Sequence, residues 1–346
     1  MSLRFATPSE IEQWNDRILS NPDQGNVFQG YEFSQQKRLG GWTPRYIVSD
    51  AISITVLQKH IVGLGHIWYV PKGPGIAHAR QLDELLRDLR KFARKHGAFM
   101  VKIEPELLKS PETEAELLKF DLVKAQPIQP NASTVLIDLH PSVDAILAGL
   151  NQKGRHAIKR AERDGVTVKK APASDENCRA LFDLLTETAA GSFRIRSYDY
   201  YKTFWQRYSD ARQGQLFFAY VDDRLVAGAF AIIFGTKSTY KDGASVRERT
   251  VYGASHLLQW HVIQWAKENG AVVHDLCGAP PSDQIKNPSH PHYGIGRFKT
   301  SFNKTVTDYV GAYDIPVKPT QYQLWRRFGE KIALRLYSYQ HNENYY

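Results

Sequence analysis

Cysteine is scarce in this sequence: the 346 residues include two, Cys178 and Cys277, far apart along the chain. So few cysteines exclude a disulfide-stapled scaffold and favour a reducing compartment. Long hydrophobic runs are missing too, because the most apolar window, residues 216–234, contains two aspartates and an arginine and cannot span a bilayer as one helix. The N-terminal stretch lacks the apolar core of a signal peptide. These features predict a cytoplasmic protein.

Common nucleotide and metal motifs are also missing. No GxxxxGK[ST] P-loop occurs, and no GxGxxG follows a predicted strand. No GxSxG elbow supports Ser/His/Asp chemistry. Five potential ligands lie close in sequence, but their spacing matches no zinc pattern, so we expect no metal site. They are His274, Asp275, Cys277, His290 and His292.

The chain is basic, with a formal net charge of +9 and an isoelectric point of about 9.3. This excess favours an anionic partner such as a nucleic acid, a nucleotide or an acidic membrane surface, although it can also serve solubility alone. The length of the chain is sufficient for two domains of ordinary size.

Two stretches of the sequence echo each other. Residues 86–105 and residues 258–277 each read as an amphipathic helix, a glycine stop and a short strand. FARKHGAF aligns with WAKENGAV without a gap, and the stops, Gly97 and Gly270, are typical left-handed C-caps. Predicted strands precede both helices, and we interpret the echo as a duplication. The strands are residues 45–59 and 66–73 in the first half, and residues 215–223, 224–236 and 237–245 in the second.

Two helices are expected between the halves. The first begins at Pro141 and Ser142, and the second runs from Asn151 to Asp164, before a glycine stop and a strand at VTVKK. The second helix is strongly basic on one side, which predicts either a solvated face or a surface for phosphates. Its basic residues are Lys153, Arg155, His156, Lys159, Arg160 and Arg163. A last amphipathic helix is expected over residues 319–340.

Halves made of strands, a helix and a strand predict an α/β chain with two GNAT-like domains, the fold of many acetyltransferases. That fold grips the pyrophosphate of coenzyme A at a helix start, usually with a [QR]xxGx[GA] motif. Here the stretch RERTVYGASHLL places its first glycine four residues after Arg249 instead of three and lacks the next. This departure weakens a coenzyme A site, although the helix amides after Gly253 can still receive an anion.

Five stretches, in order and over nearly the whole chain, resemble the Fem family of bacterial peptidoglycan bridge-forming aminoacyltransferases. They are NVFQGYEFSQQKRLGGW, WYVPKGPGI, NQKGRHAIKRAERDGVTV, YKDGAS with LLQWHVIQWAKENGAVVHDLCG, and GIGRFKTSF. The resemblance implies transfer of an amino acid from aminoacyl-tRNA to the stem peptide of a peptidoglycan precursor, either UDP-MurNAc-pentapeptide or lipid II. It implies no cofactor besides the aminoacyl-tRNA co-substrate, and a cytoplasmic monomer that can contact the inner face of the membrane.

The same resemblance implies two GNAT-like domains with the substrate cleft between them. We expect residues 1–145 and 317–346 to form the first domain, which binds the precursor and is closed by the C-terminal helix. Residues 146–316 are expected to form the second. Some members insert a long helical hairpin in the second domain, but this chain has no room for one and resembles the compact, FemX-like members.

Precursor-binding residues also follow from the resemblance, and each has a purely structural alternative. They are Lys37, Glu104, Arg194, Arg196, Tyr198, Tyr200 and Tyr240. Lys37 matches a residue that binds the precursor's phosphates, whereas Glu104 stands where the family more often has aspartate. In the family, an arginine and a tyrosine four residues apart help to bind the precursor. Two such pairs occur here, Arg194 with Tyr198 and Arg196 with Tyr200, and the sequence leaves the choice between them open.

Lys299, with Phe298 beside it, matches the catalytic lysine of the family. A lysine between Phe298 and Phe302 is either a solvated strand residue or a cation in a partly dry site. In the second case it would stabilise the oxyanion that forms when the precursor's amine attacks the aminoacyl ester, once both substrates are held together. The basic helix is then a candidate surface for tRNA phosphates.

Two other functions stay open from the sequence. One is an N-acyltransferase of the same fold that uses acetyl-coenzyme A. The other is a non-catalytic module that binds RNA or another polyanion.

Overall fold

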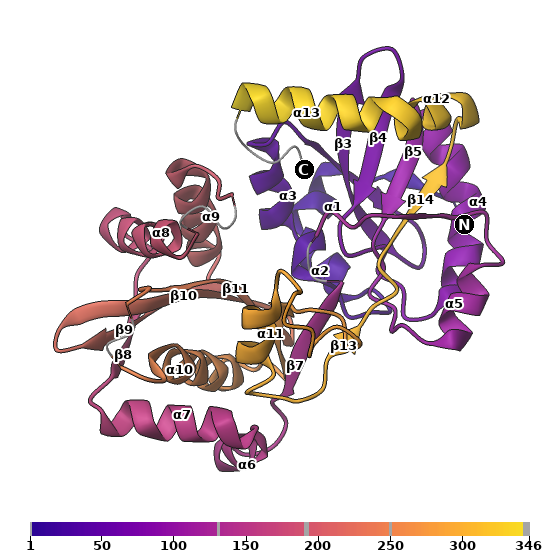
Figure 1. Ribbon diagram of the computed structural model, residues 1–346. Helices are drawn as coiled ribbons and strands as arrows, with labels where there is room; N and C mark the ends of the chain where they lie inside the picture. Colours follow the sequence, from indigo (N-terminus) through magenta and orange to yellow (C-terminus); the bar gives the residue numbers. More distant parts are fainter. Residues whose placement is uncertain (1, 130–131, 190–193, 249–250, 342–346) are drawn as a thin grey trace. The chain divides into compact units, whose positions relative to one another are not determined.

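The computed structural model describes residues 2–129, 132–189, 194–248 and 251–341. These form two compact units, one of residues 1–132 and 308–346 and the other of residues 133–307 (Figure 1). The boundaries differ from those expected at 145/146 and 316/317. Strand β7 (Ser133–Asp138) pairs with β12 (Val273–Gly278) and so belongs to the second unit. Strand β14 (Ala312–Pro316) pairs with β5 (Ala98–Ile103) and so belongs to the first.

The first unit is built on a sheet in the order β1-β2-β3-β4-β5-β14-β6. Strands β2, β3 and β4 are antiparallel, and α4 (Ala79–Lys95) then leads to β5, which is parallel to β4. The remaining strands are β1 (Arg4–Phe5), β2 (Thr43–Val48), β3 (Ser53–Ile61), β4 (Gly65–Val70) and β6 (Val123–Ala125). The remaining helices are α1 (Pro8–Glu12), α2 (Trp14–Leu19), the 3₁₀ turn Val27–Gln29, α3 (Tyr31–Arg38), α5 (Pro111–Leu117), α12 (Pro319–Leu324), a π turn (Trp325–Gly329) and α13 (Glu330–His341).

Alternation along β4 decides which helix covers which face of this sheet. Trp68 and Val70 pack in one cluster with the apolar side of α4, whereas Ile67 packs with Tyr322 and Trp325 of the C-terminal helix. Since neighbouring strand residues point to opposite faces, α4 covers one side of the sheet and the C-terminal helix the other.

The second unit repeats this plan on a sheet in the order β13-β7-β12-β11-β10-β9-β8. Strands β9, β10 and β11 are antiparallel, and α10 (Ala254–Glu268) then leads to β12, parallel to β11. Its other strands are β8 (Thr167–Ala171), β9 (Gly214–Val221), β10 (Arg224–Phe234), β11 (Lys237–Ser245) and β13 (Thr307–Asp308). Its other helices are α6 (Val143–Gly149), α7 (Gln152–Arg163), α8 (Asp175–Ala189), α9 (Tyr198–Asp210) and α11 (Tyr293–Lys299).

The echo in the sequence is therefore an echo in the fold. Each unit has three antiparallel strands, a helix, a glycine with positive φ (78° at Gly97, 86° at Gly270) and a parallel strand. Both units are GNAT-like, as predicted. Within the described residues of the second unit, the longest helices, α8 and α10, have 15 residues each, so no long helical hairpin is present there.

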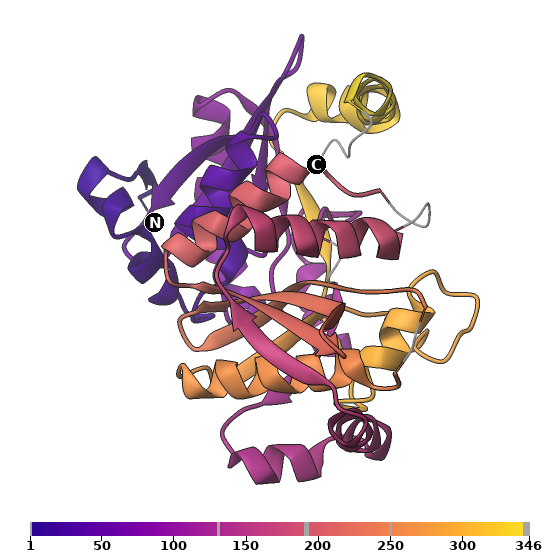
Figure 2. The same cartoon turned by 90° about the vertical axis from the view of Figure 1, so that its left-hand side faces the viewer.

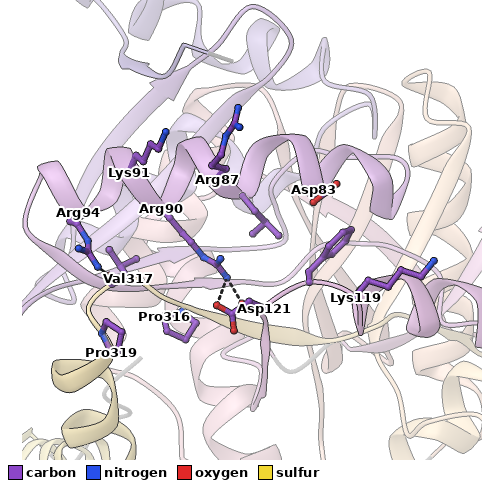
Figure 3. A pocket seen from close by; sticks show the side chains of 12 residues that line it. Asp83, Arg87, Arg90, Lys91, Arg94, Lys119, Asp121, Pro316, Val317 and Pro319 are labelled. Carbon is purple, nitrogen blue, oxygen red and sulfur yellow. Dashed lines mark hydrogen bonds and ion pairs between the residues drawn. The ribbon is translucent and has the colours of Figure 1, made fainter.

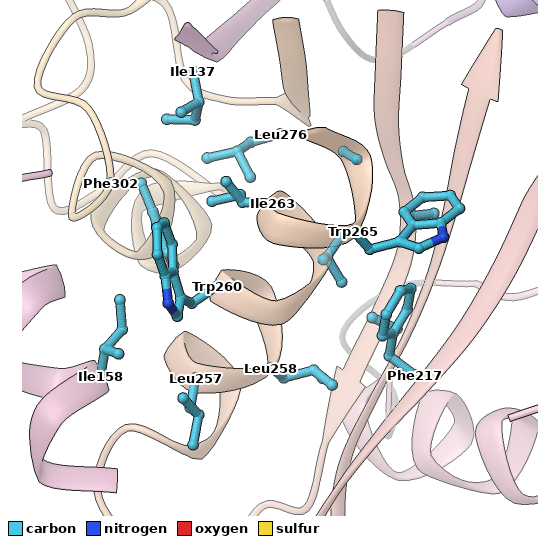
Figure 4. Packing of buried hydrophobic residues seen from close by; sticks show 14 of the residues in the cluster. Ile137, Ile158, Phe217, Leu257, Leu258, Trp260, Ile263, Trp265, Leu276 and Phe302 are labelled. Carbon is cyan, nitrogen blue, oxygen red and sulfur yellow. The ribbon is translucent and has the colours of Figure 1, made fainter. Parts of the chain in front are cut away.

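The core of the second unit forms around α10. Trp260 and Trp265 are buried, and the ring of Trp265 meets that of Phe217 edge-on at 5.5 Å between centroids (Figure 4). Helix α7 packs against α10, while α8 and α9 pack on the strands from the other side (Figure 2). Trp68 is likewise buried in the core of the first unit. Across the ranges described above, no helix is long and apolar enough to cross a membrane.

Candidate active site

A bulge in β12 shapes the centre of the candidate site. The pairing of β12 with β7 shifts register between Asp275 and Gly278, and Cys277 there has a φ of 60°. Such a left-handed conformation is uncommon for a residue other than glycine. The Asp275 carboxylate holds it in place, because it accepts hydrogen bonds from the Cys277 amide, at 2.7 Å, and from the Thr134 hydroxyl. The bulge thereby re-aims the backbone next to Lys299.

Lys299 is the last residue of α11, so it is a helical residue and not a strand residue. Its side chain is 7% exposed, and its Nζ donates a hydrogen bond to the Gly278 carbonyl at 2.7 Å. Burial lowers the pKa of Lys299, while Cys277 and Asp275 oppose this effect. The ammonium thus lies in a largely dry place and uses one of its three donors on the backbone.

The two phenylalanines do not sandwich this lysine as the sequence suggested. Phe298 and Phe302 contact each other at 5.4 Å between ring centroids and both contact His256, at 5.0 and 5.6 Å. Throughout the described ranges, the Lys299 ammonium lies over neither ring. The helix and the turn after it bring these two rings to one side, whereas the residue next to Phe298 is rotated by about 100°. The ammonium contacts the Gly278 carbonyl at the end of the β12 bulge instead.

Tyr240 lies on β11 beside the same bulge. Its hydroxyl occupies the space over Gly243, where a Cβ atom would come within 1.6 Å of it. Burial raises the pKa of Tyr240 strongly, and the charges of Asp242 and Cys277 raise it further. Thr239, next to Tyr240, pairs with Asp275 of β12, and Lys299 bonds the Gly278 carbonyl of the same strand, so both predicted residues lie beside β12.

The two arginine–tyrosine pairs differ at the start of α9. The Arg196 guanidinium lies over the Tyr200 ring, 4.8 Å from its centroid. Tyr198 instead donates its hydroxyl to Asp175 at 2.9 Å and carries the Arg179 guanidinium on its ring at 3.4 Å. Burial and the hydrogen bond to Asp175 raise the pKa of Tyr198 to about 12. The structure therefore brings Arg196 and Tyr200 together, whereas Tyr198 is engaged by Asp175 and Arg179; which pair binds the precursor stays a prediction.

Lys37 and Glu104 are both buried in the first unit. Lys37 is 8% exposed on α3, with its ammonium 5.4 Å from the centroid of Phe33. Glu104 accepts hydrogen bonds from the Tyr69 hydroxyl at 2.8 Å and from the amides of Ile128 and Gln129. Burial raises the pKa of Glu104, and the hydrogen bonds and Lys72 counter that rise. These contacts give Glu104 a structural role; any contact with substrate stays a prediction.

Lys72 was not among the predicted site residues. It is 4% exposed, has a φ of 46° and lies 3.9 Å from Glu106 and 5.3 Å from the Tyr309 ring centroid. With Glu104 and Gln129 it lines a cavity of about 10 Å³, the size of a single water. In the sequence Lys72 stands between a proline and a glycine in WYVPKGPGI. This pattern predicts a turn but does not indicate that the lysine is buried.

The basic residues of helix α7 are of two kinds: most are exposed cations, and one arginine has a structural role. Arg155 donates to the carbonyls of Ala148, at 2.8 Å, and Leu150, so it closes the end of α6. Arg160 and Arg163 pair with Asp164 at 3.2 and 3.4 Å, which reduces the net charge of the exposed side. The exposed predicted residues of this helix are Lys153, Lys159, Arg160 and Arg163.

A second hollow in the first unit, about 560 Å³, lies between α4 and the segment after β14 (Figure 3). Two of its arginines hold the fold: Arg90 pairs with Asp121 at 3.1 Å, and Arg94 donates to the Val317 carbonyl at 2.7 Å. None of the predicted site residues lines this hollow.

The histidine-rich stretch offers little for a metal. His274 is fully buried between Gln259, at 2.7 Å, and Ser238, at 2.9 Å, and burial lowers its pKa to about 3. It is therefore a neutral core residue. No group of three metal-ligating side chains occurs among the residues that the structure describes.

The start of α10 packs closely against α7 at Gly253. Gly253 has a φ of 90°, and a Cβ atom there would lie 2.2 Å from the Ala157 carbonyl oxygen of α7. This close backbone contact and the positive φ explain why a glycine stands at position 253. Arg249, the first residue of the partial motif, lies outside the described residues.

The chain is similar to known proteins over most of its length. Residues 120–224 and 218–329 match the model of the FemAB family. The lipid II:glycine glycyltransferase of Staphylococcus aureus (strain USA300) is 19% identical over 397 residues, with 90% of this chain and 93% of the relative covered. The enzyme of strain MRSA252 is 20% identical over 392 residues, with 89% and 91% covered.

Two solved structures share the fold. A crystal structure of FemX aligns with a TM-score of 0.80 at 18% identity, with 94% of this chain and 99% of that chain covered. L-PGS from Bacillus licheniformis aligns with a TM-score of 0.52 at 14% identity, with 94% and 97% covered.

Proposed function

As the chain belongs to the FemAB family and is an aminoacyltransferase, we propose that it extends the stem peptide of a peptidoglycan precursor with an amino acid taken from aminoacyl-tRNA. The observation that carries this proposal is the buried ammonium of Lys299, fixed to the Gly278 carbonyl at 2.7 Å. The named glycyltransferase relatives support the acceptor, a cell-wall precursor.

In the proposed reaction, the free amine of the stem peptide attacks the carbonyl carbon of the aminoacyl ester. A C–N bond forms, the carbonyl oxygen becomes an oxyanion, and the C–O bond to the tRNA ribose then breaks. The proton of the amine ends on the ribose oxygen that leaves. The ester is already activated, so the enzyme has to hold the two substrates together and stabilise the developing charge.

Lys299 supplies that stabilisation. Two of its donors remain for the oxyanion after the bond to Gly278. A positive charge in a dry site acts more strongly than one in water, because little solvent screens it. The same burial disfavours the charged form of Lys299 and lowers its pKa.

Precursor binding falls to residues of both units in this proposal. Lys37 receives a phosphate of the precursor, with Arg196 and Tyr200 as the assisting pair and Tyr240 near the reacting centre. Glu104 keeps the loop at Gln129 in place through its three hydrogen bonds and so acts as a positioning residue.

The exposed cations of α7 are proposed to contact tRNA phosphates. Lys153 and Lys159 carry most of that role, since Asp164 pairs with the two arginines further along the helix. A contact of this kind depends steeply on salt, because phosphate binding releases counterions.

The test is incubation of the protein with a pool of charged tRNAs and either UDP-MurNAc-pentapeptide or lipid II, followed by mass spectrometry of the precursor. The expected result is a mass increase of one amino-acid residue. Acetyl-coenzyme A in place of charged tRNA should leave the precursor unchanged. No mass increase with any charged tRNA, or acetylation by coenzyme A, would overturn the proposal.

A further inference from the structure

An apolar row faces solvent on the C-terminal helix of the first unit. Leu324, Phe328, Ile332 and Leu336 are 50%, 62%, 54% and 57% exposed. They recur every four residues, and this spacing places them along one side of a helix. Isolated exposed apolar residues are ordinary, but an aligned row of four large ones marks a docking surface.

The opposite side of this helix is firmly attached to its own unit. Tyr322 and Trp325 are buried against Ile67 and Phe99, and the Tyr322 hydroxyl bonds Asp314 at 3.2 Å. Arg94 holds the segment just before the helix. The outer row therefore belongs to an ordered element, and the core of the unit does not use it.

The π turn at Trp325–Gly329 keeps the two sides separate. A π turn adds about one residue to a helical turn, which rotates the later residues back relative to the earlier ones. Gly329 makes the turn possible, because a Cβ atom there would lie 2.7 Å from the Trp325 ring. As a result Trp325 points inward while the row of apolar residues continues on the outside into α13.

A row of basic residues runs beside the apolar row. Arg327, Lys331 and Arg335 also recur every four residues, and each directly precedes a member of the apolar row. All three are exposed, and in the part of the chain that the structure describes none of them makes an ion pair. A second apolar protein would need no such row, whereas a bilayer rich in anionic lipid complements both rows at once.

We propose that α12, the π turn and α13 form a docking surface for an anionic phospholipid bilayer. The side chains of the apolar row enter the boundary between headgroups and acyl chains, and the three cations meet lipid phosphates. The helix lies in the plane of the surface, in agreement with the lack of any described spanning helix. This surface goes beyond the proposed transfer reaction and does not depend on it.

The experiment is flotation of the full chain with vesicles that contain phosphatidylglycerol and with vesicles of phosphatidylcholine alone. The wild type should float with the anionic vesicles and release in high salt. Phe328→Ser with Ile332→Ser should weaken binding at least about tenfold, since each removes a large apolar side chain from the bilayer. Arg327→Gln, Lys331→Gln and Arg335→Gln together should weaken it on anionic vesicles only.

Leu118→Ser is the matched control, because Leu118 is 85% exposed but lies outside the row, and it should bind like the wild type. All variants should keep the wild-type melting temperature and transfer to a soluble precursor without vesicles, so a failure of the transfer proposal would be visible separately. A wild type that stays unbound, or a double serine variant that floats normally, would overturn the inference. So would a wild-type dimer by light scattering that the double variant dissociates, because the row would then cover a second copy.

Discussion

Replacing Lys299 by methionine keeps most of the length of the side chain and removes its charge. Loss of one oxyanion donor costs roughly 3–4 kcal/mol of transition-state stabilisation, or about 10²–10³ in rate. Burial of the ammonium already lowers its pKa, so the charge itself opposes folding. The lost hydrogen bond to Gly278 costs about 1 kcal/mol in return. Lys299→Met is therefore expected to unfold with nearly the wild-type free energy and to transfer hardly at all.

The pH dependence gives a second readout with a defined sign. The charged form is the active one, so transfer should fall as the pH rises through the lowered pKa of Lys299, below the ordinary 10.5. Stability should move the other way. Between the folded pKa and 10.5 the unfolded chain binds more protons, so the wild type gains stability as the pH rises through this window. The methionine variant should lack this gain.

The assay is single-turnover transfer from charged tRNA, with urea unfolding measured on the same samples. Lys304→Met is the matched control, since Lys304 is exposed and only a few residues away. Transfer at the wild-type rate by Lys299→Met would refute the electrostatic role. A large drop in its unfolding free energy would instead assign Lys299 to the fold.

Four further outcomes are expected. Lys37→Gln should raise the dissociation constant of the nucleotide-linked precursor by about 10- to 100-fold, measured by calorimetry, since a charge-assisted contact is worth roughly 1.5–3 kcal/mol; an unchanged constant would remove Lys37 from the site. Arg196→Gln should weaken precursor binding while Arg194→Gln leaves it unchanged, and the reverse result would select the other pair. Lys153→Gln with Lys159→Gln should reduce the salt dependence of tRNA binding in filter assays, whereas Arg155→Gln should lower stability only; equal salt slopes would exclude α7 as a tRNA surface. Glu104→Ala should lose about 2–3 kcal/mol in urea unfolding, because it leaves the buried Tyr69 hydroxyl and Gln129 amide and the partly buried Ile128 amide without their acceptor. A neutral effect would contradict its positioning role.

The parts of the fold that depend on local sequence patterns could be predicted, whereas those that depend on pairing between distant strands could not. The helix–glycine–strand units around Gly97 and Gly270 were predictable because helical periodicity and glycine caps act within a few residues. The unit boundaries were not, since strands β7 and β14 join sheets whose other members lie far away in sequence.

The site shows the same division. A motif selected Lys299, and its catalytic role stays a prediction. Its surroundings could not be predicted, because they depend on the β12 bulge and on helix geometry, which placed Phe298 and Phe302 elsewhere. The structural use of Arg155 could not be read from its charge, because the carbonyls that it bonds belong to the end of another helix. The burial of Lys72 could not be predicted either, because its neighbour Tyr309 lies far later in the chain.

The position of β14 between β5 and β6 governs the order in which the chain can fold during synthesis. Both neighbours leave the ribosome early, and their partner emerges only after the whole of residues 133–307. The contiguous second unit can close by itself as soon as it is made, while β6 stays without its sheet partner for that entire interval. A nascent chain arrested before Ala312 would thus carry a finished second unit attached to a half-built first one.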